Sequence, residues 1–255
     1  MLHLLIILPQ KYTNFTRHTK PLYSAWQQCP SMLIIFPILV VWLGYLAVRT
    51  RISKSAPLIS LGLSFSGAFL LSTLIFEMLP ELYTGGDHKS IGLFLSLGIL
   101  LQLSLEYLSQ GAEHGHTHLH GHSGKVPWLV IGSLCIHAFL EGIPLGGLTG
   151  LFWGVLVHKF TIALALSLLL MESKAPKFSS LWAIGLFSIM TPLGSFLSGQ
   201  SLWPEHWNNY LNALAVGILL HIATVILFES SDGHRFNLRK FAVILGGFAL
   251  GYLVG

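Results

Sequence analysis

Long apolar runs separated by short polar stretches dominate the chain from residue 32 onwards. A helix needs about 20 mostly apolar residues to cross the hydrocarbon core of a bilayer. The pattern therefore predicts an all-α integral membrane protein with eight spanning helices, the first and last being the shortest. We place them at 32–48, 57–79, 89–108, 127–149, 151–171, 180–199, 207–228 and 240–254.

Composition and charge support this interpretation. Hydrophobic residues make up 53% of the chain and charged residues only 9%, whereas soluble domains have about 25% charged residues. The net charge of +4 does not indicate a nucleic-acid partner, because the basic residues lie in short loops between apolar runs. No long polar block divides the runs, so we expect one membrane domain over 32–254 after a tail over 1–31.

The loop charges also predict an orientation. Lys89 is the one basic residue in the loops after segments two, four and six, and all others between the segments follow segments one, three, five and seven. Positive loops stay in the cytoplasm, so both termini are predicted to be extracytoplasmic. We expect the membrane to be a plasma (inner) membrane, although loop charge does not specify it. The basic tail, with Lys11, Arg17 and Lys20, disagrees with this orientation.

Four ionisable residues lie inside two adjacent apolar segments. His137 and Glu141 are four residues apart and share one helix face, and His158 and Lys159 lie in the next segment. Such groups cost roughly 2.5–3.5 kcal/mol in a bilayer on insertion scales, so they indicate a functional site. Two imidazoles and a carboxylate suit Zn²⁺ better than Ca²⁺ or Mg²⁺ and leave one position open. Their depth, about 11–15 Å into each segment, lets them meet near the midplane; the alternative is an ordinary interhelical hydrogen-bond network.

Other polar residues allow two interpretations each. Glu77 and Glu81, at the outer end of segment two, would attract cations to a mouth or be solvated at the interface. His221 would be an accessory ligand at the exit or an interhelical hydrogen-bonding residue. The loop over 109–126 would bind metal weakly or be a solvated linker, and it contains His114, His116, His118, His120 and His122.

The chain resembles the ZIP (Zrt/Irt-like) family of divalent-metal transporters over nearly all of 32–254. The matching pieces, in order, are FSGAFLLSTLIFEMLPE, HAFLEGIPLG, HK, MTPLGSFLSG and GILLHIATVILFE. The resemblance implies a metal site at His137, Glu141 and His158. It also implies inverted three-helix repeats around helices four and five, import into the cytoplasm and a homodimer.

The chain departs from the family at a second, adjacent metal position. Many members have ligands at four places where this chain has Ala138, Lys159, Ile162 and Thr191. This resembles the branch with a single transport-site metal, in which a lysine stands where the second cation would lie.

We therefore expect a non-enzymatic transporter of Zn²⁺, with Fe²⁺ and Cd²⁺ as further candidate substrates, and no permanently bound cofactor. Its expected partners are lipid, divalent metal ions and a second copy of the chain, and not nucleic acid. Two other functions remain open from the residues alone. One is a membrane-embedded zinc hydrolase, although no HExxH motif is present. The other is a metal sensor that uses the histidine-rich loop without transport.

Overall fold

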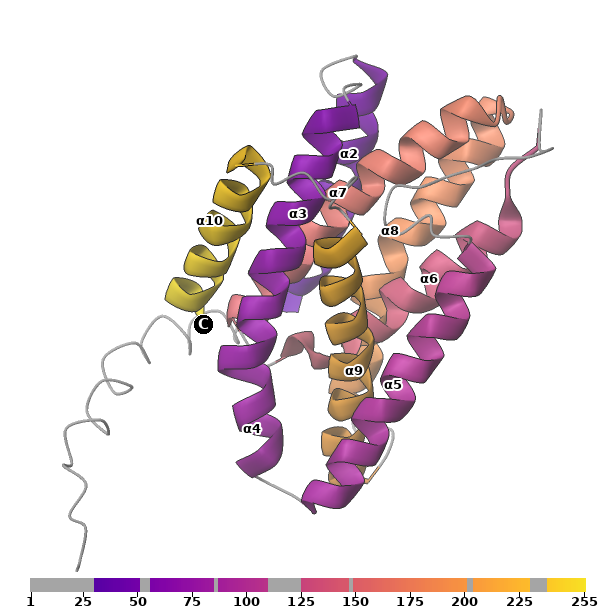
Figure 1. The fold of residues 1–255 in the computed structure, drawn as a ribbon. Coiled ribbons are helices and arrows are strands. Elements are labelled where there is room, and N and C mark those ends of the chain that lie inside the picture. The colour runs from indigo at the N-terminus through magenta and orange to yellow at the C-terminus, as the bar shows by residue number, and fades with distance from the viewer. Residues whose placement is uncertain are drawn as a thin grey trace, which may run out of the picture.

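A computed structural model describes residues 30–50, 56–84, 87–109, 125–146, 149–200, 204–229 and 238–255. The predicted tail up to residue 29 and the five loop histidines lie outside these ranges, so the expectations for them stay predictions. Every regular element in the described ranges is helical (Figure 1). The expected all-α class is therefore confirmed for this part of the chain.

Each of the eight predicted segments coincides with a helix. The helices are α2 (Pro30–Arg49), α3 (Ala56–Thr73) with α4 (Leu79–Thr84), α5 (His88–Ser109), α6 (Trp128–Gly142), α7 (Thr149–Glu172), α8 (Lys177–Gly199), α9 (Glu205–Glu229) and α10 (Leu238–Val254). Seven spans in the described residues are long and apolar enough to cross a membrane. The remaining helix, α10, has 17 residues and is slightly shorter than the usual spanning length of about 20.

Two helices depart from regular α geometry near polar or proline residues. α3 and α4 form one continuous helix through a π-helical turn, Leu74–Met78, in which Leu79 N–H donates to Leu74 O. This helix runs to Thr84, beyond the predicted end at 79. α6 ends at Gly142 and tightens into a 3-10 turn, Ile143–Gly146. Pro144 explains that turn, because proline has no N–H for an i→i−4 bond and its ring clashes with the preceding turn.

α7 is the central helix, and 78% of its membrane-spanning window is buried. It packs against α2 and α3, while α6 packs against α8. In addition, α5 packs along α9, and α10 packs along α3 (Figure 1). The apolar faces of α2, α5 and α10 are more exposed, as expected for helices that face lipid.

Candidate metal centre

Close packing of α6 on α8 fixes one wall of the site. A Cβ on Gly142 would overlap the carbonyl oxygen of Thr191, and a Cβ on Gly194 would overlap that of Phe139. Small residues let two helix backbones approach this closely inside a membrane. The contact lies one residue beyond Glu141 in α6, so the α8 residue Thr191 is brought beside the Glu141 carboxylate.

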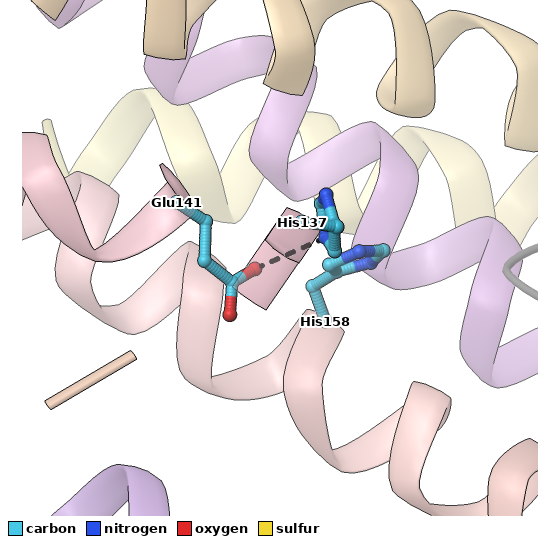
Figure 2. Close-up of side chains that lie close together, drawn as sticks. All are labelled: His137, Glu141 and His158. Carbon is cyan, nitrogen blue, oxygen red and sulfur yellow. Dashed lines mark ion pairs between the residues drawn. The ribbon is translucent and has the colours of Figure 1, made fainter. Parts of the chain in front are cut away.

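His137, Glu141 and His158 come together between α6 and α7. The spacing of the first two and the depth of His158 in its segment predicted this arrangement. The Glu141 carboxylate and both imidazoles point toward one another (Figure 2). Each offers one ligand atom, and these three atoms all lie within 4.8 Å of one another. All three side chains are buried, with at most 1% of their surface exposed.

The separations of the three ligand atoms are close to those required around a tetrahedrally coordinated ion. His137 Nε2 lies 3.3 Å from Glu141 Oε2. Two ligands on a tetrahedral Zn²⁺ at about 2.1 Å are about 3.4 Å apart, so this pair already has the required separation. The His158 ligand atom lies within 4.8 Å of both atoms of that pair, so small side-chain movements would let all three bind one ion. Two nitrogens and one oxygen leave a fourth position for water or another ligand.

Lys159 lies beside the three-residue group and pairs with Glu141. Its Nζ donates to Glu141 Oε1 at 2.6 Å and also to Thr191 Oγ1. Thr191 Oγ1 lies 2.7 Å from Glu141 Oε1 and 2.8 Å from the carbonyl oxygen of Ala138, and its single hydrogen serves one of these acceptors at a time. Nζ also lies 4.4 Å from the centre of the Phe187 ring, a cation–π contact. The ammonium is thus fully buried and held within the site, not extended toward the membrane surface.

The four positions at which the family resemblance implies lost second-site ligands are all buried. Ala138 and Ile162 offer no ligand atom, Lys159 carries a positive charge, and the Thr191 hydroxyl is engaged by Lys159. The family resemblance singled out Thr191 only as the position of an expected lost ligand, and it did not point to Phe187. No pattern in the sequence marks either residue as a Lys159 partner, because both lie on α8, far from Lys159 in the chain.

The other candidate residues, Glu77, Glu81 and His221, lie outside the His137/Glu141/His158 group. Glu77 is half-buried in the π-helical turn, and its Oε2 accepts from Leu151 N–H at the start of α7. Glu81 is exposed on α4. His221 Nε2 lies 2.7 Å from Glu106 Oε2, which matches the interhelical hydrogen-bonding interpretation, and an accessory metal role for it stays a prediction.

Known proteins match this chain over the region that holds the site. The family model for the ZIP zinc transporter matches residues 109–255. Zinc transporter ZIP1 of Bos taurus is 26% identical over 249 residues, covering 75% of this chain and 76% of that protein. The Homo sapiens ZIP1 gives the same identity and coverage. The Danio rerio ZIP1 is 26% identical over 159 residues, covering 58% of this chain and 53% of that protein. Since the family match spans more than half of the chain and includes the buried His/Glu/His group, the chain belongs to the ZIP zinc transporter family.

Proposed function

We propose that this protein carries Zn²⁺ across a membrane and that His137, Glu141 and His158 bind the ion in transit. The observation that carries the proposal is the buried group of three ligand atoms within 4.8 Å. An ionisable group inside a membrane costs free energy, so its presence there indicates a functional site. Fe²⁺ and Cd²⁺ are further candidate substrates, because the same borderline ligands accept them.

We propose a single transport-site metal. The Lys159 ammonium lies 2.6 Å from Glu141, so it occupies space that a second cation bridged by this carboxylate would need. Glu141 and Lys159 offset each other's charge, and one Zn²⁺ adds two positive charges to this pair. A second Zn²⁺ beside the ammonium would be repelled strongly in a site of low dielectric constant.

The packing supports inverted repeats of α2, α3 and α5 against α8, α9 and α10. Exchange of the repeats turns the α5–α9 contact into an α10–α3 contact, and both are extensive. The same exchange turns α2–α7 into α8–α6, and these pairs also pack together. Repeats of this kind allow alternating access around a midplane site.

The helices fall into two groups that could move against each other. One group contains α6, α7 and α8, which supply the residues of the metal centre, together with α2, which packs on α7 and α8. The other group contains α3, α5, α9 and α10. We propose that the first group moves against the second during transport. Loop charge supports the further proposal that both termini are extracytoplasmic. The family resemblance supports import into the cytoplasm and a homodimer, and we place the protein in a plasma or inner membrane.

A non-enzymatic function fits the family and the relatives, which are transporters. Uptake of zinc into proteoliposomes that contain the purified full chain tests the proposal. Zinc should accumulate faster than in protein-free vesicles and should saturate with zinc concentration. Zinc binding without accumulation would contradict transport and favour a sensor; metal-dependent hydrolysis without accumulation would favour a hydrolase.

A further inference from the structure

Glu77 connects the two helix groups at one end of α7. It lies in the π-helical turn Leu74–Met78, which contacts α7. The Glu77 Oε2 accepts from the backbone N–H of Leu151 at 3.1 Å. Leu151 is the third residue of α7, where backbone N–H groups have no acceptor within their own helix. The carboxylate therefore caps α7 from the opposite helix group.

Gly150, which has no side chain, leaves room for the Glu77 carboxylate at the start of α7. A Cβ added to Gly150 would lie 2.6 Å from Glu77 Oε2 and 3.0 Å from Gly255 Cα, so a larger residue at 150 would displace the carboxylate. The π-helical turn inserts one extra residue into a turn of the helix, a feature often found at functional sites. An N-terminal helix end also carries a partial positive charge that favours a carboxylate.

The capped helix is the one that bears the metal ligand. His158 and Lys159 lie seven and eight residues after Leu151, about 11–12 Å further along α7. A contact that fixes the start of α7 against the π-helical turn therefore also fixes the position of His158, along the axis of α7, relative to the other helix group. If the α7 group moves during transport, the Glu77–Leu151 contact must break.

We infer that Glu77 is a positioning residue that latches α7 to the opposite helix group in this conformation and is released when the site changes sides. The inference rests on the proposed transport function. It differs from attraction of cations to a mouth, because the latch requires a hydrogen-bond acceptor at residue 77, whereas attraction requires a negative charge there.

Backbone hydrogen exchange of the full chain in lipid nanodiscs tests the contact without any transport measurement. In Glu77→Ala, the amides of the first turn of α7 should exchange roughly tenfold faster or more, because loss of the Glu77 acceptor leaves Leu151 N–H unpaired. Gly150→Ala should have a similar effect, and the double variant should not exceed the larger single effect, as expected for two changes to one contact. Exchange in Glu77→Ala within about twofold of the parent overturns the inference.

Matched variants make the comparison specific. Glu81→Ala removes an exposed carboxylate from the same helix, and Gly185→Ala adds a methyl group where nothing lies within 4 Å. Both should leave exchange in α7 unchanged. A first turn of α7 that loosens equally in Glu81→Ala would also overturn the inference, because the effect would then reflect charge near this end of the helix.

Zinc flux separates the latch from cation attraction. Glu77→Ala should lower maximal flux roughly threefold or more with KM changed less than about twofold, since a state in the cycle is destabilised and the site is intact. Glu77→Gln keeps an oxygen that accepts from Leu151 and should retain more than about half of the parent flux. Equal defects in both variants with a raised KM would overturn the inference. Absence of flux in the parent would defeat the transport proposal alone, and the exchange result would still decide the latch.

Discussion

The two oxygens of Glu141 have different surroundings. Oε1 is contacted by Lys159 and Thr191, whereas Oε2 lies 3.3 Å from His137 Nε2, on the side of the imidazoles. Contacts to Oε1 orient the carboxylate before a metal arrives, and such outer contacts commonly tune a ligand. This division explains how one carboxylate can serve the metal while its charge is partly offset by a fixed ammonium.

The number of metals at the site should depend on Lys159. Lys159→Glu combined with Ala138→Asn replaces the ammonium and a methyl group with two oxygen ligands beside Glu141. The double variant should bind two transport-site metals where the parent binds one, counted by calorimetry or anomalous scattering. Lys159→Met with Ala138→Asn is a matched control that removes the charge but adds no carboxylate. One metal in the parent and in the Glu/Asn variant would contradict the fixed-cation explanation.

At the residue scale, position in the sequence predicted that His137, Glu141 and His158 lie together, but it did not predict the residues that contact Lys159 beside them. His137 and Glu141 were identifiable because four residues bring two side chains to one helix face. His158 followed from its depth in the next segment. The partners Thr191 and Phe187 depend on how α8 lies against α6, and that packing is not encoded in any short motif.

At the scale of single helices, the α6–α8 contact has little tolerance for added atoms. Gly142→Ala places a methyl group against the carbonyl of Thr191, and overpacking of this kind typically costs about 1–3 kcal/mol. We expect a lower thermal unfolding temperature in detergent and weaker zinc binding, because the two walls of the site move apart. Gly185→Ala, in open space on α8, should leave both unchanged. Parent-like stability and binding in Gly142→Ala would be inconsistent with this close contact.

The start of α5 should depend on pH through Asp87. Its carboxylate accepts from the Ser90 hydroxyl and from the backbone N–H groups of Ser90 and Lys89, and these bonds hold the pKa of Asp87 below its usual range, the Ser90 hydroxyl contributing most. A carboxyl with a lowered folded-state pKa stabilises the fold above its unfolded pKa and loses that contribution as pH falls through the folded value. Faster hydrogen exchange in the first turn of α5 is therefore expected for Asp87→Ala at neutral pH. The exchange rates of Asp87→Ala and of the parent should be compared at each pH, and they should become equal in acid. A ratio of the two rates that stays constant with pH would show that the Asp87 cap does not titrate.

The irregular turns show where sequence reasoning failed for helices. Hydropathy marked the second segment but ended it near 79, because Glu77 and Glu81 look like a polar boundary. In the fold Glu77 accepts from Leu151 N–H, and the helix continues to Thr84 through a π-helical turn. A contact with a distant helix end thus overrides the local polarity. The effect of Pro144, by contrast, was foreseeable from its missing N–H.

At the scale of the whole molecule, the histidine-rich loop should not be required for transport. Deletion of His114 to His122 removes five histidines that lie outside the apolar segments. Zinc flux should remain measurable, with changes mainly in apparent affinity or regulation, because a polar loop cannot form the midplane site. A control that replaces these five histidines with serine keeps the loop length. Complete loss of flux in both variants, with normal expression and folding, would contradict this prediction.

The number and order of the spanning helices could be predicted because the bilayer imposes both a length and an apolar composition on each of them. Their packing partners could not, since apolar helices in lipid associate through shape and small residues. The contacts of α5 with α9 and of α10 with α3 join segments far apart in the chain. Only the family resemblance gave an expectation for such pairs.

The most direct measurement of the central claim is initial zinc flux into proteoliposomes containing His137→Ala, Glu141→Ala or His158→Ala. Each variant removes one of three ligand atoms from the buried group, so each should nearly abolish flux while the protein still reaches the membrane and folds. His221→Ala removes a histidine that lies with Glu106, outside the group, and should retain measurable flux. Parent-like flux in any two of the three ligand variants would contradict a transport site at His137, Glu141 and His158.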